Sequence, residues 1–233
     1  MGLILRVDVD KPYGRKNLFE KLKSKAREDF WFPQINSFGY LSALQELLVF
    51  CNKNNVKGAF YHRNCTIPNE EVTHLLKEGN HQVGFHAENT KNLSTFQNEL
   101  NIFKAKINNL NISSFTKHGS GDIKIGKHHY PPYEPEKYKK WSKELDICYL
   151  YGNEICDSEM DFKSVENFHP KMFWVHREYR NSKFSSLETV INLAKTCNIP
   201  IIIHPSNFIA NPEVNQDFKK LVALAKDHHV PWI

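Results

Sequence analysis

Signals for buried strands alternate with signals for helices along this chain, and that alternation constrains its fold more than any other feature. Leu3–Val9 is a short, mainly apolar run typical of a buried strand, and Val56–Tyr61 predicts the next strand. Between them, apolar residues recur at helical spacing from Tyr40 to Cys51, which predicts a helix with one apolar face. Strands separated by helices indicate βα units around a parallel sheet.

The alternation continues to the end of the sequence. Asn69 and Gly79 are typical of the first and last residues of a helix, and Asn211 before Pro212 predicts the start of the last one. Two segments resemble capping boxes, Ser94–Gln97 and Ser185–Glu188. Five further strands are predicted, at His81–His86, Ser113–Lys117, Asp146–Tyr151, Met172–Val175 and Ile199–His204. With no repeat or linker, residues 1–233 are expected to form a single α/β domain, an incomplete or distorted (β/α) barrel of about seven parallel strands.

Composition excludes several classes of function. The chain of 233 residues is 40% apolar with a net charge of +5, and its lysines are scattered as on solvated helix faces. Because no basic stripe is interleaved with aromatics, we expect no nucleic-acid partner. No apolar stretch approaches the ~20 residues that cross a bilayer, so no membrane span is expected. Five cysteines without a C-x-x-C pair, and a first strand interrupted by charge, favour a cytoplasmic protein without a signal peptide.

Asp8 and Asp10 end the first predicted strand. Their spacing of two places both side chains on the same side of the strand. Two carboxylates on one side of a buried strand repel each other, which is easier to explain at the strand's end beside a cation. The alternative is that one caps the following turn and the other is solvated.

Histidines end three later strands: His86, His118 and His204. Taken alone, a histidine such as His86 is more often a packed or surface residue than a ligand, and the alternative for His204 is a hydrogen-bonded residue at the rim. The carboxyl ends of parallel strands converge on one crevice, however, so these imidazoles are expected to meet Asp8 and Asp10. Carboxylate plus imidazole is the ligand chemistry of a hydrolytic metal site.

In three stretches the chain resembles the polysaccharide deacetylase superfamily, the NodB-homology fold of carbohydrate esterases. Val7–Asp10 is similar to the family's first motif, in which one Asp is the general base and the other binds metal. Val56–Tyr61 followed by Glu78–His86 resembles the second strand, the helix and the histidine motif. Ile202-Ile203-His204 resembles the last motif, in which an aliphatic residue lines the acyl pocket and the histidine is the general acid.

Two departures from the family pattern stand out. The family usually has His-x-x-x-His with both histidines on the metal, whereas Thr90 is four residues after His86. The Arg/Pro/Tyr motif is replaced in strand order by Lys117–Gly121, and Tyr130–Tyr133 matches its composition but comes later. A divergent branch associated with surface-polysaccharide gene clusters is more similar, because it has His-x-Glu and His-Gly-Ser like 86–88 and 118–120.

The resemblance implies a divalent metal, with zinc the expected ion. Asp10 and His86 would be ligands, and the third would be His118 or, as second choice, Glu88. Asp8 would accept a proton from water as base, and His204 would donate one to the leaving amine.

The implied substrate is an N-acyl amino sugar, as a polysaccharide precursor or as a nucleotide- or lipid-linked sugar. Ile202 would line the acyl pocket, and Tyr130, Tyr133 and Trp174 could stack on sugar rings, although ordinary core or loop packing more often explains such aromatics. Two other functions remain open: a non-catalytic carbohydrate-binding protein on the same fold, and a hydrolase of another C–N amide bond.

Overall fold

The strands form a nearly closed parallel barrel. The computed structural model describes residues 1–13, 17–31, 38–107, 110–119, 126–162, 168–184 and 186–233. Eight strands pair in the order β5-β4-β3-β2-β1-β8-β7-β6, and within the described ranges no ladder joins β5 to β6. The strands are β1 (Leu3–Val9), β2 (Gly58–His62), β3 (Gln82–Ala87), β4 (Ile112–Lys117), β5 (Cys148–Tyr149), β6 (Tyr151–Ile155), β7 (His169–Trp174) and β8 (Ile199–Ile203).

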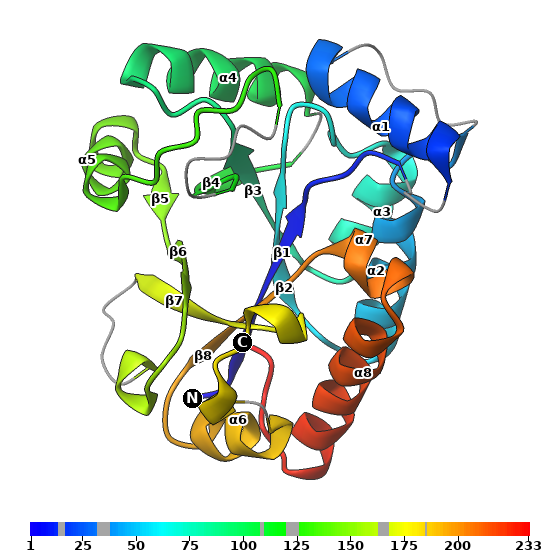
Figure 1. Ribbon diagram of the computed structural model, residues 1–233, viewed down its shortest axis with the longest axis vertical. Helices are drawn as coiled ribbons and strands as arrows, with labels where there is room; N and C mark the ends of the chain where they lie inside the picture. The colour runs from blue at the N-terminus through cyan, green and yellow to red at the C-terminus, as the bar shows by residue number, and fades with distance from the viewer. Residues whose placement is uncertain (14–16, 32–37, 108–109, 120–125, 163–167, 185) are drawn as a thin grey trace.

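Helices surround the strands on the outside (Figure 1). They are α1 (Leu18–Phe30), α2 (Ser42–Lys53), α3 (Glu70–Glu78), α4 (Leu93–Lys106), α5 (Pro135–Leu145), α6 (Leu187–Ala194), α7 (Pro205–Ala210) and α8 (Pro212–Asp227). Short 3-10 turns cover Glu159–Phe162, Arg177–Tyr179 and Ser182–Phe184. None of the helices in the described ranges is both long enough and apolar enough to cross a bilayer.

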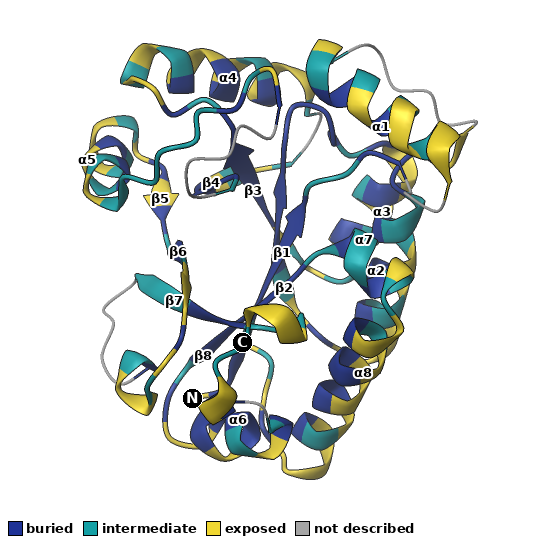
Figure 2. Cartoon of the chain, viewed as in Figure 1, coloured by how far each residue is buried: buried dark blue, intermediate teal, exposed yellow. Residues whose placement is uncertain are grey.

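Side chains of β1 alternate between two environments. Leu5 and Val7 lie on the outer side, in an apolar cluster that also contains Leu44 of α2 and Leu221 of α8. The side chains between them point into the barrel, where an interior cluster is formed by Ala59, Tyr61, Tyr151, Met172 and Ile202. Figure 2 shows the central strands β1, β2 and β8 as mostly buried, in contrast to the outer faces of the helices, whereas β5, β6 and β7 are partly exposed. The core therefore has two layers, separated by the sheet.

The predicted fold class is confirmed, and the strand count differs by one. The predicted strand Asp146–Tyr151 is divided into β5 and β6, which pair with opposite edges of the sheet. The capping box at Ser94–Gln97 is wrong, because the N-cap of α4 is two residues earlier and its box is formed by Asn92 and Thr95. Ser185 lies outside the described residues. Helices α1, α5 and α7 were not predicted.

Candidate metal centre

Asp10 lies at the centre of a cluster formed by the carboxyl ends of β1, β3, β4 and β8. His86 Nε2 is 3.3 Å from Asp10 Oδ1, and His118 Nδ1 is 3.0 Å from the same oxygen. His204 Nε2 is 3.5 Å from the other oxygen, Oδ2. Asp8 also lies in the cluster, with its Oδ2 3.5 Å from His86 Nε2. The sheet thus brings together the five residues that the sequence placed at strand ends.

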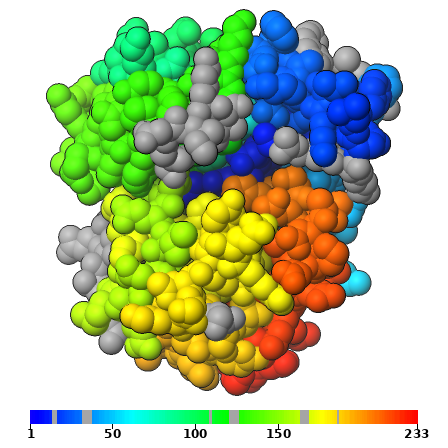
Figure 3. Space-filling model, in the orientation of Figure 1, coloured from blue at the N-terminus to red at the C-terminus, as the bar shows by residue number. Residues whose placement is uncertain are grey.

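This cluster opens to the surface. Figure 3 shows a hollow whose floor is made of dark-blue atoms from the N-terminal part of the chain, bordered by green, yellow and orange segments. Asp10 keeps 18% of its side chain exposed, whereas the imidazoles of His86 and His118 are almost fully buried. A small molecule can therefore reach the Asp10 carboxylate, whereas the two imidazoles are shielded from solvent.

The donor set fits a divalent metal. Side-chain atoms of Asp10, His86 and His118 lie within 4.8 Å of one another. Asp10 Oδ1 and His118 Nδ1 are buried and 3.0 Å apart, but they do not have hydrogen-bond geometry with each other or with another described residue. Buried polar atoms are normally paired, and a cation between these two atoms would satisfy both. Burial, together with the Arg63 charge, lowers the pKa of His118 well below its usual value, which keeps its nitrogen lone pair available.

His86 is oriented by the neighbouring strand. Its Nδ1 lies 2.7 Å from Oγ1 of Thr116, which is directly opposite in the β3–β4 register. This contact leaves Nε2 facing the carboxylates. Partners of this kind fix the ring orientation of metal-binding histidines in proteins.

Arg6 holds the Asp8 carboxylate in a two-point contact. Its Nε donates to Oδ1 at 2.8 Å and its Nη2 donates to Oδ2 at 2.6 Å. The guanidinium is fully buried and also donates to the Gly152 carbonyl and to Asn153 Oδ1. Burial by itself raises the pKa of Asp8, but the Arg6 charge offsets this and the net shift is downward, so Asp8 is ionised.

Sequence reasoning missed the role of Arg6. It treated Arg6 only as an interruption of an apolar strand. The spacing of two between Arg6 and Asp8 was the available signal, because it places both side chains on the same side of β1.

Glu88 is paired with Arg63, which sequence reasoning also missed. Arg63 Nη2 donates to Glu88 Oε2 at 2.8 Å, and Arg63 Nη1 donates to the Asp10 carbonyl at 2.6 Å. The structure therefore does not bring Glu88 into the group formed by Asp10, His86 and His118. Arg63 directly follows β2, so its place at a strand end was the signal that could have identified it.

Thr90, where the family pattern would place a second histidine, faces away from the cluster. It is buried, and its Oγ1 lies 3.1 Å from the Tyr138 hydroxyl of α5. His118, from the end of β4, occupies the third position instead. Ser120 and Gly121 of the same segment lie outside the described residues.

The predicted substrate-binding residues lie in different surroundings. Trp174 stacks on the His204 ring, with centroids 5.8 Å apart, beside the cluster. Ile202 is buried inside the barrel. The Tyr133 hydroxyl lies 3.1 Å from that of Tyr149, and the backbone N–H of Tyr130 donates to the Glu88 carbonyl. Their contact with a sugar stays a prediction.

Three buried ionisable groups near the cluster were also missed. Burial lowers the pKa of Lys117 to about 7, and its Nζ donates to the His118 carbonyl. Burial raises the pKa of Glu99 to about 8. The His129 ring packs edge-on to His118 at 5.5 Å, and burial lowers its pKa to about 3.

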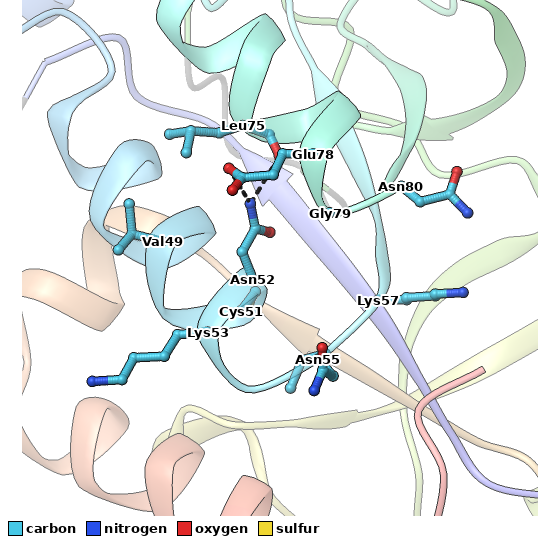
Figure 4. A pocket seen from close by; sticks show the side chains of 11 residues that line it. Val49, Cys51, Asn52, Lys53, Asn55, Lys57, Leu75, Glu78, Gly79 and Asn80 are labelled. Atoms are coloured by element: carbon cyan, nitrogen blue, oxygen red, sulfur yellow. Dashed lines mark hydrogen bonds between the residues drawn. The ribbon is translucent and has the colours of Figure 1, made fainter.

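A separate surface pocket lies between α2 and α3 (Figure 4). Its volume is about 660 Å³, and its lining includes Asn52, Lys57 and Glu78. Asn52 donates to the Leu75 carbonyl and to Glu78, so the side chains of Asn52 and Glu78 are already paired. The pocket adjoins the amino ends of β2 and β3, whereas the Asp10 cluster is at the carboxyl ends, and the two are distinct.

Solved structures of similar fold align with nearly the whole of this chain. The chain aligns with a Streptococcus mutans CE4 esterase at a TM-score of 0.52 and 11% identity, over 98% of this chain and 83% of the other. It also aligns with the catalytic domain of peptidoglycan N-acetylglucosamine deacetylase from Eubacterium rectale, at a TM-score of 0.47 and 14% identity, over 99% and 87% of the two chains. No protein-family model matches the sequence, and no curated protein matches it. The chain therefore has the fold of the CE4 esterase, at low sequence identity.

Proposed function

We propose that this protein is a metal-dependent hydrolase that removes an N-acetyl or other N-acyl group from an amino sugar. The observation that carries the proposal is the Asp10, His86 and His118 cluster, with Asp8 and His204 at its edges, at the carboxyl end of a deacetylase-like barrel. Catalytic zinc sites commonly have three protein ligands and leave one position open. Zinc is the ion that we propose, because carboxylate and imidazole ligands suit it.

The residues of the cluster have separate roles in the proposed amide hydrolysis. Asp10, His86 and His118 would hold a divalent ion, which would supply Lewis-acid polarisation and make water more acidic. Asp8 accepts the proton from the attacking water, and the two-point contact with Arg6 fixes the direction of its oxygens. His204 Nε2 donates a proton to the leaving amine, with its ring held against Trp174.

The sugar is proposed to bind over the exposed side of Asp10. Trp174 and Tyr130 are half-buried at this end of the barrel and are proposed to stack on sugar rings, with Tyr133 behind them. Ile202 of β8 lies two residues before His204, on the same side by strand alternation, and is proposed to form the apolar base of the acyl pocket. A polysaccharide precursor or a nucleotide- or lipid-linked sugar fits this chemistry.

Zinc titration by calorimetry tests the metal assignment. Wild type is expected to bind one zinc ion tightly, and Asp10→Ala and His118→Ala are expected to lose binding by at least about tenfold. Glu88→Gln should bind as wild type, because Glu88 is paired with Arg63. His228→Ala, an exposed histidine far along the chain, is the matched control. Equal binding by all variants, or no binding by any, would show that the assignment is wrong.

Product analysis tests the reaction. Wild type with zinc is expected to release acetate from N-acetylated amino-sugar oligomers and not from small cyclic amides, and a chelator should abolish the release. Sugar binding without released acetate would instead support the carbohydrate-binding alternative. Hydrolysis of the cyclic amides alone would support a hydrolase of another C–N bond.

A further inference from the structure

Helix α1 directs polar residues at the protein interior and apolar residues at the solvent, the reverse of an ordinary surface helix. Its buried residues are polar: Ser24, Arg27 and Glu28. Its outward side carries Leu18, Phe19, Leu22 and Phe30, which are 71%, 61%, 60% and 70% exposed. Surface helices normally direct their apolar stripe at the core. In Figure 2, much of α1 is accordingly coloured as exposed.

The buried polar side fixes α1 in this orientation. The Glu28 carboxylate accepts from Lys11 Nζ at 3.1 Å and from Ser24 Oγ at 3.2 Å. Arg27 Nε donates to the Cys65 carbonyl at 3.1 Å. Glu28 also lies 3.7 Å from Arg63, the residue that donates to the Asp10 carbonyl. Rotation of α1 to bury its apolar residues would break these contacts. The contacts of Arg27 and Glu28 therefore keep the apolar residues exposed.

The exposed apolar residues form one patch. At 100° per residue, Leu18, Phe19, Leu22 and Phe30 fall on a single stripe of α1. Phe38, which is 53% exposed, lies next to the stripe. The Nζ of Lys23 is between the two, 4.9 Å from the Phe19 ring centroid and 4.7 Å from the Phe38 ring centroid. We call these five residues the α1 patch. The other exposed large apolar residues of the described part of the chain are spread over several different elements.

Lysines border the α1 patch on both sides. On the helix, Lys21 and Lys25 lie along one edge of the stripe and Lys23 along the other. Lys127 adds a fourth ammonium group, 5.1 Å from the Phe30 ring centroid. Among the acids of α1, Asp29 falls within the stripe and is paired with Lys25, whereas Glu20 and Glu28 fall on the side of the buried residues. Cations therefore outnumber anions around the patch.

We propose that the α1 patch docks onto a membrane surface that contains anionic lipids, and that the substrate is a sugar carried by a lipid. Apolar side chains flanked by lysines are the pattern of helices that lie in the membrane interface. A second copy of this chain is a poor occupant, because a symmetric contact would bring the two sets of lysines together. In Figure 3 the blue surface of α1 lies at the edge of the hollow, so docking would turn the hollow toward the lipid headgroups.

The substrate part of this inference rests on the proposed hydrolase function, whereas the docking can be tested alone. Wild type is expected to sediment with vesicles of phosphatidylcholine and phosphatidylglycerol, and more weakly with phosphatidylcholine alone. Phe19→Ser with Leu22→Ser should weaken sedimentation at least about tenfold, because both side chains leave water on docking. Lys21→Glu should weaken binding to the anionic vesicles only. Circular dichroism verifies that each variant is folded.

Matched controls and a second assay make the outcomes decisive. Val49→Ser and Met160→Ser replace exposed apolar residues elsewhere and should bind vesicles as wild type. Acetate release from a water-soluble substrate should be unchanged in Phe19→Ser with Leu22→Ser. If acetate is never released but the patch variant still loses vesicle binding, docking stands and the hydrolase proposal fails. Absence of vesicle binding, equal binding by the patch variant, or a wild-type dimer that the variant disperses would overturn the docking proposal.

Discussion

The two sides of strand β1 differ in what they contribute to the protein. On the outer side, Leu5 and Val7 are buried against helices in a continuous apolar cluster. On the inner side, Arg6 and Asp8 are buried as a hydrogen-bonded ion pair below the candidate metal centre. Apolar burial stabilises a fold directly, whereas a buried ion pair at best offsets its own desolvation. The difference indicates that the outer side maintains the barrel and the inner side is retained for chemistry.

The largest expected effect is on the inner side. Asp8→Asn removes the proposed base while keeping its shape, so kcat for acetate release should fall by about 10²–10⁴. Zinc binding should persist, because Asp10, His86 and His118 are unchanged. Steady-state kinetics and calorimetry on the same sample measure both. A variant that keeps kcat within about tenfold of wild type would remove the base role of Asp8 and break the comparison.

Arg6→Met tests whether the inner pair is coupled. It leaves Asp8 without its guanidinium partner in the barrel interior, and the free energy of unfolding should fall by about 3–5 kcal/mol. Arg6→Met with Asp8→Leu should regain most of this stability, because no buried charge is left unpaired. It should remain inactive, because the proposed base Asp8 is absent. Urea unfolding provides the comparison. A double variant no more stable than the single one would contradict the coupling.

Leu5→Ala tests the outer side. The side chain is fully buried, so its truncation should cost about 3 kcal/mol through lost burial and the cavity that remains. Below the unfolding transition, kcat should stay within about twofold of wild type, because that side of β1 does not face the metal centre. The same urea experiment with parallel kinetics measures both quantities. A large fall in kcat without a loss of stability would show that the two sides are not separate.

The smallest effect concerns a polar residue on the outer side. His62 alternates with Tyr61 on β2, is fully buried, and has its pKa lowered to about 4 by burial. The unfolded chain takes up this proton near pH 6.5 and the folded protein does not, so stability is lost as pH falls through that range.

Between pH 6.5 and pH 5, His62 should account for about 2 kcal/mol of the lost stability. His62→Asn should lack this component, and His228→Asn, which changes an exposed histidine, should keep it. Unfolding curves at several pH values supply the measurement. Equal pH dependence in wild type and His62→Asn would show that His62 is not buried in its neutral form.

Local sequence signals predicted the elements that follow ordinary rules. The apolar runs located most of the strands, and Asn69 and Asn211 cap their helices as expected. Helix α1 was missed because its apolar and polar sides are reversed, so periodicity gave no reason to place it against the barrel. The division between β5 and β6 was missed because the two strands are separated by a single residue.

For the site, the sequence alone determined that Asp8, Asp10, His86, His118 and His204 would meet. Strand periodicity and parallel order suffice for this, because the ends of parallel strands converge whatever the details of packing. Only the tertiary structure decided which partners these residues have. The contacts of Arg6 with Gly152, of Arg63 with Glu88 and of Thr90 with Tyr138 join distant segments. Such contacts depend on how side chains fill the space between elements, which no local pattern in the sequence encodes.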